Sequence, residues 1–131
     1  MQPAPVPANV AEALSMLDAA LDHLNAADWG SLPTEIHRQA LTGLGRAEAK
    51  QTAARTAALA AFDAASGYTA DGHGGPVPWL RGVTRITKPA AQEQAGWPRR
   101  LHRHPRLGKA MTAGWLSPSW AKLFATWNDR L

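Results

Sequence analysis

Apolar residues near the start of the chain recur every three or four positions, the spacing of one face of an α-helix. The stripe consists of Val10, Leu14, Leu17, Leu21 and Leu24. Asn9 stands directly before it as a helix cap, and Glu12 stands where a capping-box carboxylate reaches back to the Asn9 backbone N–H. The pattern predicts a first helix that ends near residue 27.

A second, longer apolar stripe predicts a helix from a Thr34 cap to about Ser66. Its members are Ile36, Ala40, Leu44, Ala47, Ala54, Ala58, Phe62 and Ala65. Gly43 and Gly45 are the positions where so long a helix would bend. The many alanines allow close helix–helix approach, so we expect the first helix to pack antiparallel along the second as a hairpin scaffold over residues 9–66.

Proline, glycine and capping residues divide the remaining chain into shorter helices. Gly67 is expected to end the long helix, with a loop over 67–75 that contains the lone histidine His73. Four helices then follow: 76–83, one after a Thr87 cap that Pro98 kinks or ends near Trp97, one from Pro105 to Gly114, and one after a Ser117 cap.

These patterns predict an all-α fold in which a long antiparallel helical hairpin precedes a cluster of short helices. Residues 1–8 form a flexible proline-rich tail, and residues 9–131 form a single all-helical domain. Within that domain, the hairpin scaffold over 9–66 is distinguished from a basic, tryptophan-rich bundle over 67–131.

Residues 76–94 have the pattern of a helix-turn-helix corner: a short helix, a turn with the aliphatic Ile86, a threonine cap and a second helix. Lys88, Gln92 and Gln94 stand near the start of the second helix, where such residues read base edges in DNA. Arg85 occupies a turn position where glycine is more usual. The other interpretation is an ordinary corner of an all-α domain.

Charge is distributed unevenly within a formal net charge of +4. Residues 1–65 carry four cations and seven acids, whereas residues 66–131 carry ten cations and three acids. The segment 96–110 reads GWPRRLHRHPRLGKA and contains no acid. The candidate phosphate contacts are Arg81, Arg85, Lys88, Arg99, Arg100, Arg103, Arg106 and Lys109. A face with so few acids favours a polyanion partner over a merely solvated surface.

The sequence lacks the residue patterns that metal binding, catalysis and membrane insertion require. It has no cysteine, His73 is a lone histidine without ligand partners, and the pair His102 and His104 has no further ligand nearby. We therefore expect no metal or other cofactor. We find no nucleophile–base pair and no phosphate-binding glycine loop, which argues against catalysis by this chain. No apolar run approaches the ~18 residues of a membrane span, and no signal peptide is recognisable. We expect a cytoplasmic protein without a membrane partner.

Five of the six tryptophans fall in the second half of the chain. Trp115, Trp120 and Trp127 are spaced by five and seven residues, which favours ordinary packing between the last helices. The alternative is that these three side chains cover a partner surface. A homodimer through the long helix, with contacts from Leu59 and Phe62, is the related partner hypothesis.

Three segments together resemble a known family: LGRAEAKQTAARTAALAAFDAASGY, DGHGGPVPWLRGVTRIT and GWPRRLHRHPRLGKAMTAGWLSPSWAKLFATWNDRL. The order and spacing of DGH, WLR, RRL-x-x-HP and G-x-L-S-x-x-x-A are similar to those of the actinobacterial 13E12 repeat family, whose shared region is domain of unknown function number 222. Residues 87–124 also look similar to the helix-turn-helix region of ParB-like partition proteins, although Trp120 and Pro98 depart from that pattern.

The resemblance implies an N-terminal accessory domain that precedes an HNH nuclease module in its parent protein. This chain contains no ββα pattern with histidine and asparagine ligands, so no catalytic HNH residue can be assigned, and we expect no nuclease module within these 131 residues. Two hypotheses follow. The first is non-catalytic DNA binding through the basic helical face, and the second is a protein-interaction or dimerisation module.

Overall fold

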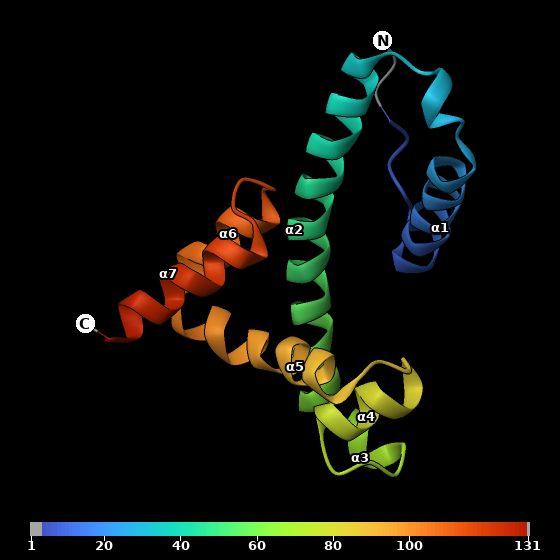
Figure 1. The fold of residues 1–131 in the computed structure, drawn as a ribbon. Coiled ribbons are helices and arrows are strands. Elements are labelled where there is room, and N and C mark those ends of the chain that lie inside the picture. The colour runs from blue at the N-terminus through green and yellow to red at the C-terminus, as the bar shows by residue number, and fades with distance from the viewer. Residues whose placement is uncertain (1–3, 131) are drawn as a thin grey trace. The chain divides into compact units, whose positions relative to one another are not determined.

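The computed structural model of this chain describes residues 4–130, and these residues form seven α-helices, one short 3-10 helix and no strand (Figure 1). The all-α prediction is confirmed. The elements are α1 (Val10–Ala26), η1 (Trp29–Ser31), α2 (Thr34–Ala64), α3 (Gly67–Ala70), α4 (Pro76–Val83), α5 (Lys88–Arg103), α6 (Pro105–Thr112) and α7 (Pro118–Arg130). No helix of the described part is both long and apolar enough to cross a membrane.

The chain divides into two compact units, of which the first ends at Gln39 and the second begins at Ala40, inside α2. The antiparallel packing of the first two predicted helices therefore stays a prediction. Of the predicted tail over residues 1–8, the first three residues lie outside the described part. Residues 4–7 have no regular structure, and α1 begins at Val10.

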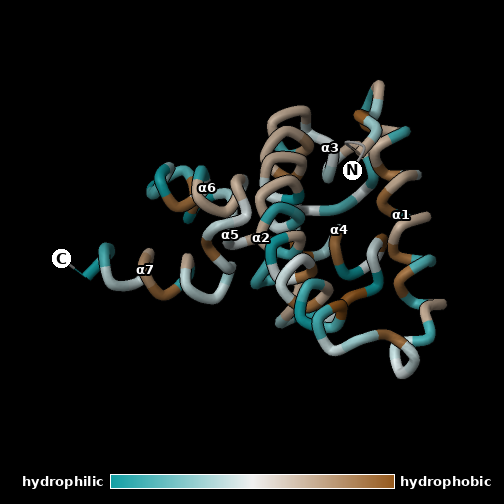
Figure 2. Tube along the Cα trace, turned by 90° about the horizontal axis from the view of Figure 1, so that it is seen from above, coloured by the Kyte–Doolittle hydropathy of each residue, from teal (hydrophilic) through white to brown (hydrophobic). Residues whose placement is uncertain are grey.

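In the first unit, local hydrogen bonds determine where α1 begins. The Asn9 side chain accepts a bond from the Glu12 N–H at 2.9 Å, as the capping pattern predicts. The Glu12 carboxylate accepts from the N–H of Ala8, at 3.2 Å, and not from that of Asn9. Hydrophobic positions recur along α1 (Figure 2), but no residue of this helix is buried, and Leu14 is 61% exposed.

The second unit has a core of two clusters joined by α5. Leu59, Tyr68, Leu80 and Ala91 form the first cluster, where α3, α4 and the start of α5 gather around the C-terminal end of α2 (Figure 1). The second contains Trp97, Met111 and Ala121, with Ala53, Leu101 and Leu116 packed against it. Because Ala91 and Trp97 both belong to α5, this helix connects the two clusters. Burial of one face of α5 in both clusters determines which of its side chains are exposed.

The end of α2 differs from the expected glycine stop. Ser66 adopts the left-handed conformation with φ 59°, and residues 67–70 form the single turn α3 where we expected a loop. Gly67 is required for space: a Cβ built on it would lie 2.1 Å from Cε2 of Phe62. The aromatic ring therefore closes over a position that only glycine can occupy.

The later helices begin and end largely at the residues that the sequence indicates. Thr87 caps α5 through a bond from the Ala90 N–H at 3.4 Å, and Ser117 caps α7 through a bond from the Trp120 N–H at 3.2 Å. Gly114, with φ 80°, follows α6. The amides of Gly114 and Trp115 donate to the carbonyls of Met111 and Ala110, the two bonds of a Schellman motif.

Pro98 lies inside α5, and the helix continues past it to Arg103. A proline in a helix interior removes one backbone bond and typically costs about 3 kcal/mol. Trp97 and Leu101, which flank Pro98 along the helix, both belong to the second core cluster. Their burial holds the segment helical, so the prediction that the helix could end near Trp97 is replaced by one continuous element.

Candidate nucleic-acid interface

The continuity of α5 aligns four of the candidate residues along one helical face. Lys88, Gln92, Arg99 and Arg103 are spaced by four, seven and four residues, which brings them within about 60° of one another around the helix. All four are exposed, whereas Ala91 and Trp97 are buried. At 1.5 Å per residue this α5 stripe extends about 22 Å.

The turn before α5 presents a further cation. Arg85 is exposed and adopts the left-handed conformation, with φ 58°, between the end of α4 and the Thr87 cap. Glycine is the usual residue in that conformation because a Cβ is disfavoured there. Arg81 lies exposed in the last turn of α4. The interpretation of this corner as a DNA-binding helix-turn-helix stays a prediction.

Arg100 is bound within the protein itself. Its guanidinium carbon lies 4.5 Å from the centroid of the Trp97 ring, a cation–π contact. The side chain is half-buried, and its Nη1 is buried without a hydrogen-bond partner among residues 4–130. Arg100 therefore covers the buried tryptophan and is the least accessible of the predicted phosphate contacts.

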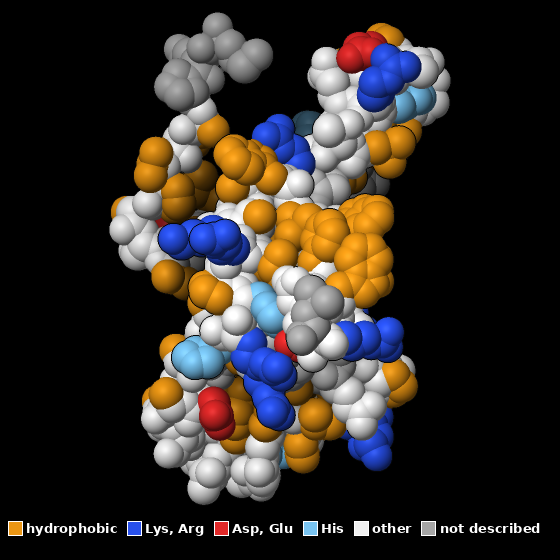
Figure 3. All heavy atoms as spheres, turned by 90° about the vertical axis from the view of Figure 1, so that its left-hand side faces the viewer, with side chains coloured by type: hydrophobic (Ala, Val, Ile, Leu, Met, Phe, Trp, Pro, Cys, Tyr) orange, Lys and Arg blue, Asp and Glu red, His pale blue; other side chains and the backbone are white. Residues whose placement is uncertain are grey.

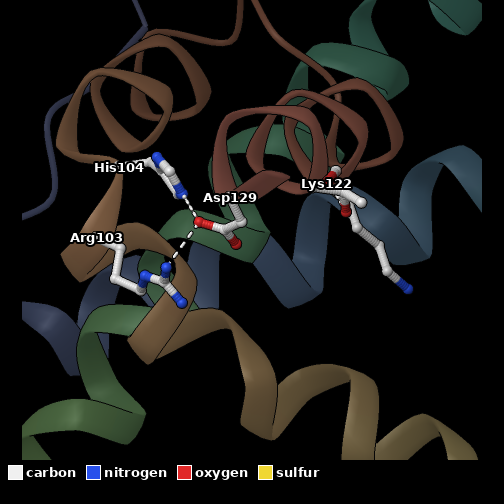
Figure 4. Close-up of polar contacts among 5 residues, drawn as sticks. Arg103, His104, Lys122 and Asp129 are labelled. Carbon is white, nitrogen blue, oxygen red and sulfur yellow. Dashed lines mark hydrogen bonds and ion pairs between the residues drawn. The ribbon is translucent and has the colours of Figure 1, made fainter. Parts of the chain in front are cut away.

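Arg103 and His104 share a carboxylate from a distant part of the chain (Figure 4). Nη2 of Arg103 lies 3.0 Å from Oδ1 of Asp129, and Nε2 of His104 donates to the same oxygen at 2.9 Å. These contacts join the end of α5 to the last turns of α7. The sequence pattern did not associate Asp129 with the basic segment because 26 residues separate it from Arg103.

Glu93, the acid that lies among the cations of α5, forms an ion pair with Lys122 of α7. Lys122 Nζ lies 2.7 Å from a carboxylate oxygen of Glu93, so Glu93 does not leave a free negative charge beside the α5 stripe. Lys122, labelled in Figure 4, points away from the Asp129 carboxylate. The remaining exposed cations of the region make no ion pair with any residue from 4 to 130. They are Arg81, Arg85, Lys88, Arg99, Arg106 and Lys109.

Cations of α6 and α2 add to the charge of the second unit. Arg106 and Lys109 are exposed one turn apart on α6. On α2, Lys50 and Arg46 approach Gly114, which follows α6. Cε of Lys50 and Cβ of Arg46 lie 3.1 and 3.4 Å from the point where a Cβ added to Gly114 would lie. No local spacing signal could have identified these two residues. Figure 3 shows the Lys and Arg side chains in separate groups rather than in one continuous patch.

The two glutamines predicted to read bases have different environments. Gln92 is exposed in the α5 stripe, whereas Gln94 is half-buried and lines a cavity against α2 and α4. Gln92 thus lies with the cations of the α5 stripe, and Gln94 lies outside that stripe. No group of three or more His, Cys, Asp or Glu side chains that could hold a metal ion occurs within the described residues.

The three late tryptophans are exposed, so the prediction that they pack in the core is wrong. Trp115 is 81% exposed, and Trp120 and Trp127 are about half exposed. On α7, Phe124 contacts both neighbours, with ring centroids 5.6 Å from Trp120 and 5.7 Å from Trp127. Small residues, Ala121 and Ala125, form the buried face of α7 instead. Figure 3 shows a continuous hydrophobic patch between groups of cations.

Of the two dimer contacts predicted on the long helix, Leu59 is buried and Phe62 is partly buried. Leu59 is 6% exposed in the first core cluster, and Phe62 packs edge-to-face against Tyr68 and Trp79. Leu59 is thus covered within this chain, whereas Phe62 keeps part of its surface exposed, and a homodimer through the long helix stays a prediction.

Comparison of the chain with protein-family models, with curated proteins and with solved structures yields no match.

Proposed function

We propose that the second unit binds DNA without catalysing a reaction, as an accessory domain of an HNH-endonuclease-like protein of the 13E12 repeat type. The α5 stripe is the observation that carries this proposal. It presents three cations and one amide on a single exposed face about 22 Å long. Phosphate contacts of this kind position a protein on a duplex, while the amide of Gln92 is the group suited to read adenine.

The charge of the whole unit supports the same proposal. Residues 40–131 carry thirteen lysines and arginines against five carboxylates, whereas residues 1–39 carry one arginine against five carboxylates. Two of the five carboxylates in the second unit are bound to Lys122, Arg103 and His104. Exposed cations thus outnumber free acids on this unit, which favours association with a polyanion.

Fluorescence anisotropy with a duplex of roughly 20 base pairs, titrated from about 50 to 300 mM salt, tests the proposal. Engagement of four or more phosphates predicts a log–log slope of about −4 or steeper. The double variant Lys88→Gln, Arg99→Gln removes two stripe cations that make no ion pair among residues 4–130. We expect it to weaken binding about tenfold or more and to reduce the slope by roughly 2.

A matched control removes the same charge elsewhere. Arg38→Gln combined with Arg130→Gln changes the net charge equally but leaves the α5 stripe complete. We expect this control to retain most of the affinity. Equal losses in the two double variants would mean that net charge alone attracts DNA, and absence of binding at 50 mM salt would refute the proposal.

The exposed tryptophans favour a second candidate, a protein-interaction module. Trp115, Trp120 and Trp127 present large apolar surfaces outside the core, and aromatic side chains dominate the binding energy of many protein interfaces. Sedimentation equilibrium of the chain and of a Trp120→Ser, Trp127→Ser variant tests self-association through this surface. A concentration-dependent dimer that the substitutions abolish supports the interaction module, and a monomer at all concentrations removes homodimerisation through α7.

A further inference from the structure

A cavity of about 550 Å³ lies in the second unit between α2, α4 and α5. Its apolar lining comes from the first core cluster and its neighbours: Leu59, Phe62, Trp79, Leu80 and Ile86. The volume lies within the range of roughly 300–1,000 Å³ that is usual for small-molecule sites. The α5 stripe does not contribute to this lining, so the cavity is separate from the proposed phosphate contacts.

The aromatic wall of the cavity is held in place by its own contacts. The Phe62 and Trp79 rings meet edge to face with centroids 4.9 Å apart. The Trp79 indole N–H donates to the Asp71 carboxylate at 2.8 Å, which fixes the orientation of the ring. A preformed wall of this kind lowers the ordering cost that a ligand would otherwise meet.

Two polar side chains at the cavity have no partner within residues 4–130. Arg55 on α2 is half-buried, and neither it nor Gln94 on α5 makes an ion pair or hydrogen bond with any residue from 4 to 130. The third polar group, the Thr84 hydroxyl, already donates to the Leu80 carbonyl at 2.7 Å. The lining of an apolar cavity thus includes one arginine and one glutamine whose polar groups have no partner among the described residues.

We propose that this cavity binds a small apolar carboxylate, with the hydrocarbon part against Phe62 and Trp79 and the carboxylate at Arg55. Guanidinium and carboxylate form paired, parallel N–H···O bonds that are stronger than neutral ones, and the Gln94 amide can donate a further bond. The proposal commits to an anion because Arg55 is the charged group of the lining. It is independent of DNA binding.

Decanoate, used below its micelle concentration at neutral pH, is a suitable probe, with decanol and decylamine as neutral and cationic analogues. The readout is the set of tryptophan indole resonances in a ¹H–¹⁵N spectrum, because Trp79 lines the cavity whereas Trp115 and Trp127 do not. A Trp79→Phe variant assigns the resonance. We expect decanoate to shift Trp79 selectively and to bind about tenfold or more tightly than either analogue.

Arg55→Gln should reduce decanoate affinity about tenfold while leaving decanol affinity unchanged. Arg55→Lys should restore part of the preference for the anion, and Arg46→Gln, on the same helix but outside the cavity, should have no effect. A well-dispersed spectrum of each variant confirms that it is folded. Equal affinity for decanoate and decanol, or decanoate affinity that survives Arg55→Gln, would overturn the proposal, as would the absence of any Trp79 shift.

Discussion

Arg103 on α5 and Asp129 on α7 form an ion pair, with Nη2 3.0 Å from Oδ1, and His104 donates to the same oxygen at 2.9 Å. Both side chains of the pair are partly exposed, so it contributes little to stability, at most about 1 kcal/mol. Its larger consequence concerns the proposed DNA binding. In such a complex, the Asp129 carboxylate at the end of the α5 stripe would compete with phosphate for Arg103.

Asp129→Asn should therefore tighten binding to duplex DNA. The substitution frees Arg103 and removes one negative charge beside the stripe, so we expect a gain of roughly three- to tenfold at 0.1 M salt. Anisotropy titrations measure the gain, and chemical denaturation should show only a small change in stability. Glu48→Gln removes one exposed acid from α2 and serves as the control; an equal gain there would show that the effect is not specific to Asp129.

Arg85→Gly should stabilise the protein and weaken DNA binding at once. Arg85 has φ 58°, a conformation that costs a non-glycine residue about 1–2 kcal/mol. Glycine removes most of this cost, so we expect the free energy of unfolding in urea to rise by about 1 kcal/mol. The loss of one phosphate contact should reduce the salt slope by about 0.9.

Lys88→Gln is the companion variant for this prediction. It removes one cation three residues away in a residue with ordinary helical backbone, so it should weaken DNA binding without increasing stability. If the free energy of unfolding rose in both Arg85→Gly and Lys88→Gln, or in neither, the result would contradict backbone strain at Arg85.

Gly67→Ala should destabilise the second unit. The new methyl group would meet the Phe62 ring at 2.1 Å, and that ring cannot move freely because it packs against Tyr68 and Trp79. Overpacking of this kind typically costs about 1–3 kcal/mol, measurable by urea denaturation. Gly43→Ala lies in α2 with no atom within 4 Å of the added Cβ, and it should stabilise by up to ~1 kcal/mol.

Tyr68 should titrate above the usual value for tyrosine. Burial and then the charge of Asp63 raise the pKa of its hydroxyl above 10.0, because both disfavour the phenolate. Since Tyr68 is the sole tyrosine of the sequence, absorbance at 295 nm reports it directly. Native protein should show a midpoint above that of the urea-unfolded chain.

The raised pKa also predicts a loss of stability at alkaline pH. The folded state keeps the Tyr68 proton more tightly than the unfolded state, so stability falls as the pH rises above about 10. Below that pH both states are protonated and the contribution is constant. Tyr68→Phe should remove this part of the alkaline loss, and an unchanged pH profile in that variant would be inconsistent with the raised pKa.

Three helix caps and the stop at Gly114 were predictable because they depend on neighbouring residues, whereas the expected stops at Gly67 and near Trp97 were not found. Asn9, Thr87, Ser117 and Gly114 each act on backbone groups within a few positions, so a short stretch of sequence contains the whole interaction. The concentration of cations over residues 81–109 was likewise visible from the order of residues alone. Both inferences rest on interactions of short range in sequence.

The tertiary structure decided which of those cations are available and which aromatic residues are buried. Arg100 lies over Trp97, Arg103 pairs with Asp129 from α7, and Gln94 faces a cavity built from α2 and α4. The spacing of Trp120 and Trp127 did not predict their exposure, since alanines occupy the buried face of α7. Helical periodicity predicts which residues share a face, but the partners that cover that face come from distant segments, so only packing determines whether it is core or surface.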